Sequence, residues 1–267
     1  MPLCVGQIDA ALADSGLRNK SVVVFASDNG GCPTQSGTMN YPLRGAKLSL
    51  FEGGVRLPAF VYAPGYMAAA RRGETYHGLM HATDWLPTLL EAAGASAPSG
   101  LDGVSQYEQI VLGTGGASPR TELLHNINIW TTDGARLEEL SYTYAALRSG
   151  DWKLITREVD AGWYTLANAD DDDDGWGAYS CMSTSGGSYD YLFNVTGDPY
   201  ETDNLYDERS DVVSALEAKL EAYAAAMRTT VWAASATSAA VAAWASLGEG
   251  AYVTPWENVS GYSYGYE

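Results

Sequence analysis

A short apolar run that ends in an acid and an amide constrains this chain more than any other feature. Residues Val22–Ala26 are apolar throughout, and Asp28, Asn29 and two glycines follow them closely. Such a run is typical of a strand buried on both faces, and in open α/β sheets ligands bind just beyond the carboxyl ends of the strands. Asp28 offers carboxylate oxygens and Asn29 a carbonyl oxygen, which suit a hard divalent cation. The sequence therefore predicts a cation site where this strand ends.

A lysine set among glycines follows in the segment PLRGAKLSLFEGGVR, residues 42–56. Lys47 supplies a point positive charge for an anion. Arg44 and Arg56 flank it, and we interpret both as structural partners of acids such as Glu52. Because the chain carries a formal net charge of −18, an anionic ligand needs local positive charge, and we expect Lys47 to provide it.

These segments, a strand with DNGG followed by PLRG-x-K and EGGVR-x-P, resemble the sulfatase family of the alkaline-phosphatase-like superfamily. Later segments resemble its arylsulfatase B branch in the same order, from about residue 5 to about residue 232: HATDWLPTLL (81–90), PRTELLHN (119–126), RSGDWKL (148–154) and LFNVTGDPYETDNL (192–205). The resemblance implies an α/β fold class, namely the carboxy-terminal part of an alkaline-phosphatase-like sulfatase fold plus a small antiparallel α+β subdomain.

The resemblance also implies an activity and roles for particular residues. Sulfatases hydrolyse sulfate esters with calcium, so Asp28 and Asn29 are implied as calcium ligands and Lys47 as the contact to the sulfate. His125 lies where the arylsulfatase B branch has a substrate-side loop, which makes it a second candidate for substrate contact. The implied partner is a sulfate-ester substrate, in particular a sulfated glycan.

The nucleophile of the resembled family is missing from this sequence. It is a formylglycine made from the cysteine of a C-x-P-x-R motif, and none of Cys4, Cys32 and Cys181 has that context. We therefore expect the chain to be the carboxy-terminal portion of a sulfatase, with the missing amino-terminal half as a partner, and to be catalytically silent alone. Two alternatives stay open: a non-catalytic remnant that binds a cation, a sulfated glycan or the missing half, and a phosphoesterase of the same superfamily.

The composition of the chain limits the classes of protein to which it can belong. At 46% hydrophobic and 18% charged residues the chain is globular in character, and its negative charge argues against nucleic acid as a partner. The sequence contains no apolar stretch of 18 residues, so it predicts no membrane-spanning helix. The three cysteines are compatible with one disulfide and a free thiol, or with three free thiols. Sequons at Asn19, Asn194 and Asn258 are consistent with a glycoprotein, and the resemblance implies a secreted or lysosomal full-length protein.

Four regions are expected along the chain: residues 1–94 as part of the catalytic domain, 95–140 as a loop-rich connection, 141–228 as an antiparallel sheet with a helix, and 229–267 as a tail. The first region should contain a helix over Val5–Leu17, two strands of a parallel sheet at Val22–Ala26 and Ala59–Ala63, and a helix from Trp85 to Ala93. Thr83 or Asp84 is the expected cap of the last helix.

The region 141–228 shows hairpin patterning followed by helical spacing. Residues 142–156 turn at Ser149-Gly-Asp, and 189–195 is expected to be a third strand. A helix over about 211–227 should cover one face of this sheet. The five acids at Asp170–Asp174 are interpreted as a solvated loop rather than a calcium site.

Overall fold

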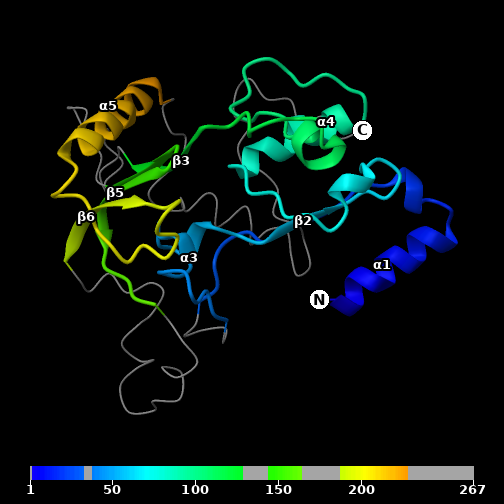
Figure 1. Cartoon of the computed structure of the whole chain (residues 1–267), viewed down its shortest axis with the longest axis horizontal. Coiled ribbons are helices and arrows are strands. Elements are labelled where there is room, and N and C mark those ends of the chain that lie inside the picture. Colours follow the sequence, from blue (N-terminus) through cyan, green and yellow to red (C-terminus); the bar gives the residue numbers. More distant parts are fainter. Residues whose placement is uncertain (1, 33–37, 129–143, 164–186, 228–267) are drawn as a thin grey trace, which may run out of the picture.

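The structure is a computed structural model that describes residues 2–32, 38–128, 144–163 and 187–227. The predictions for Asp170–Asp174, Cys181 and the tail 229–267 lie outside these residues. Two groups of elements are visible in Figure 1: a sheet, β3 to β6, with helix α5 at one end, and strand β2 with helices α4 and α1 toward the other. None of the helices in the described ranges combines the length and apolarity needed to cross a bilayer.

The smaller sheet consists of β1 (Val23–Ala26) and β2 (Ala59–Tyr62). The two strands pair, as expected, but they run antiparallel, with Val23 opposite Tyr62. The expectation of a parallel sheet is therefore wrong. A parallel pair needs a long crossover, usually a helix, whereas the described part of this connection contains only the four-residue α3 (Glu52–Val55).

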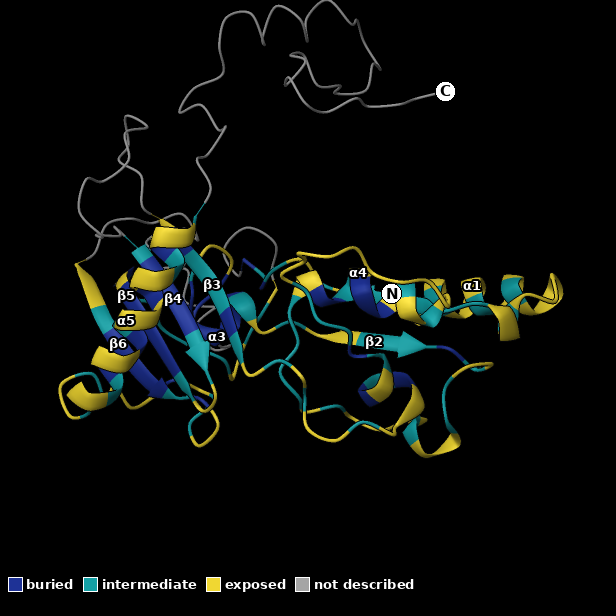
Figure 2. Ribbon diagram, turned by 90° about the horizontal axis from the view of Figure 1, so that it is seen from above, coloured by how far each residue is buried: buried dark blue, intermediate teal, exposed yellow. Residues whose placement is uncertain are grey.

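Helix α1 (Pro2–Asp14) precedes this sheet and buries none of its residues. Asp9 ties it to the rest of the protein, because Arg18 Nε donates to Asp9 Oδ1 at 2.7 Å and the Tyr62 hydroxyl donates to the same oxygen at 2.9 Å. The helix lies far from the β3–β6 sheet (Figure 2). Its apolar residues Leu3 and Ile8 are therefore exposed.

Helix α4 (Trp85–Ala92) begins after a short 3-10 turn at Ala82–Asp84, and it ends before Gly94, which has a φ of +72°. Asp84 is the N-cap residue of α4, as one of the two expected caps, but its side chain makes no capping hydrogen bond to that helix. The preceding 3-10 turn is capped by a reciprocal box, in which the His81 side chain accepts from the Thr83 backbone and Asp84 Oδ2 accepts from His81 N at 2.9 Å. Asp84 is fully buried against Arg120. His81 therefore has a structural hydrogen-bonding role.

The larger sheet is antiparallel with the strand order β3-β4-β5-β6. Its strands are β3 (Glu122–Asn128), β4 (Tyr144–Ser149), β5 (Trp152–Val159) and β6 (Ser188–Asn194). The predicted hairpin is confirmed: β4 pairs with β5, and Gly150 adopts a φ of +57° in the turn between them. β3 was not expected, because residues 95–140 were predicted to be loops with short elements.

Successive side chains of each strand point to opposite faces of the larger sheet, and both faces are covered by other parts of the protein. One face packs on α5 (Ser210–Ala226) through Val213, Leu216, Leu220 and Ala224, which confirms the predicted helix. The other face packs against Leu50 and Phe51, just before α3. This second contact brings the segment around Lys47 onto the sheet. Further short turns lie at Arg18–Lys20, Ala69–Arg71 and Glu108–Leu112.

Candidate active site

Asp28 and Asn29 lie in the turn that follows β1. The backbone amide of Asn29 donates to Asp28 Oδ1 at 2.8 Å, and Asn29 Nδ2 donates to the carbonyl of Gly30 at 2.9 Å. These bonds use one oxygen of Asp28 and the amide nitrogen of Asn29. The second carboxylate oxygen and the Asn29 side-chain carbonyl have no hydrogen bond within the described residues, so both are available to a ligand.

Glycines let this turn pack directly against α3. Gly30 N donates to Gly54 O at 2.9 Å. A Cβ on Gly30 would lie 1.8 Å from the carbonyl oxygen of Gly53, and a Cβ on Gly54 would lie 2.2 Å from that of Ser49. No side chain fits in these positions, so the glycines of DNGG and EGG are needed for close approach of the two backbones.

Lys47 lies beside the same turn. Its backbone nitrogen donates to Gly31 O at 3.0 Å, and Asn40 accepts from Gly31 N at 2.7 Å and donates to Gly31 O at 2.9 Å. The Lys47 side chain is exposed and has no ion-pair partner among the described residues. The structure therefore brings the loops of Asp28 and Lys47 together and leaves the ammonium group available to an anion.

Arg44 is structural, as expected, although its acid is Asp160 rather than Glu52. Its Nη2 lies 2.5 Å from Asp160 Oδ1, its Nε donates to Ala161 O at 2.7 Å, and its guanidinium stacks 4.3 Å from the ring centroid of Phe51. Arg56 does face Glu52, but at 3.8 Å the ion pair is loose. Arg56 is about half exposed, with 52% of its side-chain surface accessible.

A buried ion cluster holds α3 on the larger sheet. Lys153 Nζ on β5 lies 2.9 Å from Glu52 Oε1 and 2.9 Å from Glu201 Oε1, and all three side chains are almost inaccessible to solvent. Glu201 Oε2 also accepts from Glu52 N at 2.6 Å. Sequence reasoning missed this cluster, because its members are separated by about 50 to 150 residues and no local pattern pairs them.

The carboxyl groups of this cluster have opposite pKa shifts. Burial raises the pKa of both. At Glu52 the positive charges of Lys153, Arg148 and Arg56 outweigh burial and hold the pKa below its ordinary value. At Glu201 burial, together with the negative charge of Glu52, outweighs Lys153 and leaves the pKa raised.

The chemistry of the Asp28 turn fits part of a calcium site. Calcium takes six to eight oxygen ligands, and Asp28 with Asn29 supplies two accessible side-chain groups of this type. Within the described ranges, no group of three or more histidine, cysteine, aspartate or glutamate residues could hold a metal. A cation bound here would need further oxygens from water or from another polypeptide.

His125 lies in strand β3 and not in a loop, so its expected position in a substrate-side loop is wrong. Its Nε2 is buried and has no hydrogen-bond partner among the described residues. Burial, and then the nearby charges of Lys153, His81 and Arg148, lower the pKa of His125 well below its ordinary value. The imidazole is therefore neutral at pH 7, with one ring nitrogen as donor and the other as acceptor.

The structure tests the predictions for the cysteines and places two of the three glycosylation sequons. Cys32 is disulfide-bonded and Cys4 is a free, exposed thiol, so the alternative of three free thiols is wrong. Asn19 is exposed, while Asn194 is half-buried and its Oδ1 accepts from Gly197 N at 3.1 Å. Asn258 lies outside the described residues. Use of these sequons stays a prediction.

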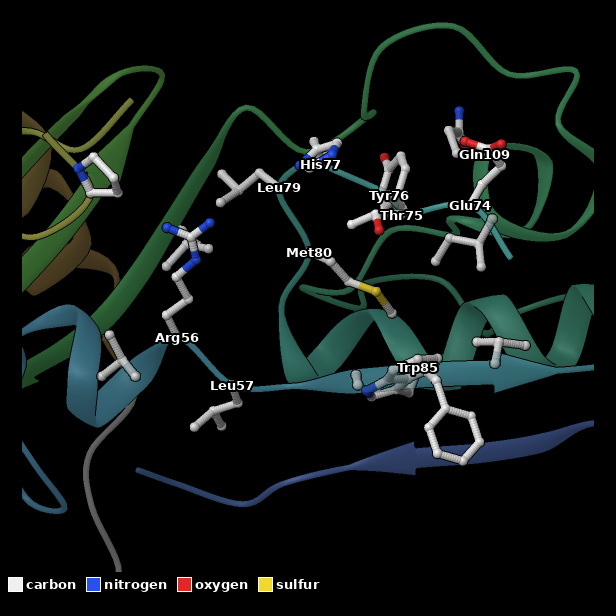
Figure 3. Close-up of a pocket in the computed structure, with 18 of the residues that line it drawn as sticks. Arg56, Leu57, Glu74, Thr75, Tyr76, His77, Leu79, Met80, Trp85 and Gln109 are labelled. Carbon is white, nitrogen blue, oxygen red and sulfur yellow. The ribbon is translucent and has the colours of Figure 1, made fainter. Parts of the chain in front are cut away.

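A pocket of about 870 Å³ lies between the two groups of elements. Arg56 and Leu57 contribute to one wall, and the segment that contains Tyr76, Leu79 and Met80 faces them (Figure 3). The larger sheet closes the pocket with residues that include His125 and Arg148. Helix α3 adjoins both this pocket and the Asp28 turn, because Glu52 lines the pocket and Gly54 bonds Gly30.

Comparison with known proteins identifies the family. Residues 4–95 match the family model described as Sulfatase. The chain is 32% identical to mouse arylsulfatase J over 230 residues, which cover 82% of this chain and 37% of the relative. It is 34% identical to bovine arylsulfatase A over 212 residues, which cover 78% of this chain and 38% of the relative.

Solved structures agree on the fold. The protein Ps i-CgsB in complex with k-i-k-neocarrahexaose matches 86% of this chain with a TM-score of 0.61 and 21% identity, over 42% of its own length. This chain thus spans about two fifths of the relatives it matches. The matches share the fold, and the sequence relatives are arylsulfatases. We conclude that the chain belongs to the sulfatase family and is arylsulfatase-like.

Proposed function

We propose that this chain is the carboxy-terminal portion of a sulfuric ester hydrolase and that it supplies part of the active site. The observation that carries the proposal is the hydrogen bond between Lys47 N and Gly31 O, which holds a lysine with no ion-pair partner among the described residues beside the turn of Asp28 and Asn29. A sulfate monoester is an anion, so an exposed ammonium group next to oxygen ligands for a cation suits its binding.

Each residue has a distinct part in the proposed reaction. Asp28 and Asn29 would hold calcium, which would offset charge on the sulfate oxygens when bound. Lys47 would bind and orient the sulfate by charge and hydrogen bonding. The C-x-P-x-R motif that yields the family's nucleophile is absent from these 267 residues, so we expect binding by this chain without turnover.

The proposed substrate is a sulfated glycan. Two structural neighbours support this choice, because one was solved with k-i-k-neocarrahexaose and another with its substrate D-glucosamine-2-N,6-O-disulfate. A phosphoesterase of the same superfamily is the less favoured candidate, since the sequence relatives are arylsulfatases.

A further proposal concerns the partner that completes the fold. A two-stranded sheet is marginally stable alone, and β1 and β2 are mostly half-buried, while α1 buries no residue. These elements would form an interface with the missing amino-terminal half of the sulfatase. The disulfide at Cys32 supports an oxidising compartment, so we propose a secreted or lysosomal full-length protein.

Calcium titration and a sulfatase assay test the proposed function. We expect weak calcium binding to residues 1–267 by calorimetry, its loss in Asp28→Ala, and no hydrolysis of 4-nitrophenyl sulfate with calcium present. Lys47→Ala should weaken binding of inorganic sulfate, while Lys20→Ala, which removes an exposed lysine outside the site, should leave it unchanged. Calcium binding that persists in Asp28→Ala would contradict the metal assignment, and turnover abolished by Asp28→Ala would show a nucleophile within this chain.

A further inference from the structure

The pocket behind α3 gathers positive charge within a strongly acidic chain. Arg56 and Arg148 both line it, and neither is fully engaged by the protein. Arg56 lies 3.8 Å from Glu52 Oε2, beyond hydrogen-bond distance, and among the described residues the Arg148 side chain makes one hydrogen bond, a long one of 3.4 Å from Nε to Gly150 O. Two guanidinium groups are therefore available to an anion that enters the pocket.

Two residues that line the pocket have hydrogen-bonding capacity that no other described residue uses. Glu52 Oε2 and His125 Nε2 are buried and have no hydrogen-bond partner among the described residues, and both residues line the pocket. A buried polar atom without a hydrogen bond lowers the stability of the fold, so a role for each of these two atoms has to be sought. A hydroxyl group suits both atoms, because it can donate to a carboxylate and either donate to or accept from a neutral imidazole.

Part of the pocket wall is aromatic and apolar. Trp85, Tyr76 and Phe60 line the pocket, together with Met80 and Leu79; Figure 3 shows Trp85 at β2 and Met80 farther from that strand. A ring with an apolar face can pack against such side chains. The volume of about 870 Å³ falls in the range of small-molecule sites.

We propose that this pocket binds an anionic sugar unit, with its sulfate or carboxylate group between Arg56 and Arg148, its hydroxyl groups toward Glu52 and His125, and its ring against the aromatic wall. The inference rests on the proposed function in one respect: the sugar is taken to be a unit of the same sulfated glycan. The pocket is separate from the Asp28 and Lys47 loops, and α3 lies between the two sites.

Glu52 does not exclude an anion from this pocket. Its charge is offset by Lys153, which lies 2.9 Å from Oε1. Among the other lining residues, the three arginines Arg56, Arg71 and Arg148 outnumber the one further acid, Glu74. A purely apolar anion would leave Glu52 Oε2 and His125 Nε2 unsatisfied, whereas a sugar brings hydroxyl groups. The observations therefore favour an anionic saccharide over an anionic alkyl or aryl compound.

Calorimetric titration of residues 1–267 tests the proposal. The probe is D-glucosamine-2-N,6-O-disulfate, compared with unsulfated glucosamine, inorganic sulfate and 4-nitrophenyl sulfate. We expect the disulfated sugar to bind more tightly than the other three. Arg56→Gln and Arg148→Gln should each weaken its binding by about tenfold, the loss of one charge-assisted contact, and His125→Phe should weaken it less.

Controls separate this pocket from the proposed sulfate contact. Arg157→Gln removes an exposed arginine of β5 that is not among the lining residues, so it should leave binding unchanged, and thermal unfolding should verify that every variant is folded. Equal weakening in Arg157→Gln, or equal binding of 4-nitrophenyl sulfate and the disulfated sugar, would overturn the proposal. Binding that is lost in Lys47→Ala and retained in both pocket arginine variants would also overturn it, while leaving the proposed function intact.

Discussion

The most informative perturbation of this protein is the removal of the buried charge at Lys153. Lys153→Met keeps a long apolar side chain but leaves Glu52 and Glu201 buried without their shared cation, each of which now lies 2.9 Å from Nζ. Removing one partner from a buried ion pair costs about 3–5 kcal/mol. Since whole domains are stable by only about 5–15 kcal/mol, we expect a loss that is easily measured.

Urea denaturation followed by tryptophan fluorescence measures this loss. With a slope of about 2 kcal/mol per molar urea, a loss of about 4 kcal/mol lowers the midpoint by about 2 M. The same substitution at a surface pair is the matched control: Lys219 pairs with Glu122 and is 46% exposed, so Lys219→Met should cost at most about 1 kcal/mol.

The pH dependence of the effect follows from the carboxyl groups. In the wild type the pKa of Glu52 is lowered, so its pairing stabilises the fold above the ordinary pKa of 4.5 and is lost as the pH falls through the lowered value. In Lys153→Met the two buried carboxyls should have raised pKa values. The deficit of the variant should therefore grow as the pH rises above about 4.5 and shrink in acid.

A triple variant isolates the unpaired charge as the cause. Lys153→Met combined with Glu52→Gln and Glu201→Gln removes every charge of the cluster, and it should recover much of the lost stability, because buried ion pairs are often replaceable by neutral groups. The reasoning is refuted if Lys153→Met costs no more than Lys219→Met, or if the triple variant is as unstable as the single one.

Two further predictions concern stability. Burial alone would raise the pKa of Asp84, but hydrogen bonds from Arg120 and from two backbone amides outweigh burial and lower it. The ionised carboxylate therefore stabilises the fold, and this stability is lost in acid. Asp84→Asn should remove that contribution, so the unfolding free energy of the variant should decline less steeply below about pH 4 than that of the wild type. Gly30→Ala places a Cβ 1.8 Å from Gly53 O and should cost about 1–3 kcal/mol or more and weaken calcium binding. Gly116→Ala, with no atom within 4 Å of the added Cβ, should change neither; equal effects of the two substitutions would contradict the packing argument.

Elements with a regular local pattern could be predicted from the sequence. The turn at Gly150 and the flanking apolar strands indicated the β4–β5 hairpin, and the spacing of Leu216 and Leu220 indicated α5. Each of these signals lies within about 20 residues. Elements that depend on short-range periodicity can therefore be predicted from the sequence alone.

Strand direction and long-range pairing could not be predicted in this way. Val22–Ala26 and Ala59–Ala63 are short apolar runs, and such runs carry no mark of whether they pair parallel or antiparallel. β3 contains His125 and two asparagines, which interrupt any clean alternation. The sequence did place Asp28 at the end of a strand, but the hydrogen bond from Lys47 to Gly31 required the structure.

The larger sheet is part of what positions the candidate site, although none of the residues assigned to calcium or to the sulfate contact lies on it. Three contacts hold the segment around Lys47: Arg44 bonds to Asp160, Leu50 N donates to Glu158 Oε2 at 2.8 Å, and Glu52 pairs with Lys153. These contacts come from β5 and the residue just after it. Because both ends of the Lys47 loop are fixed to this sheet, the loop is held against the Asp28 turn, where its ammonium group can meet an anion.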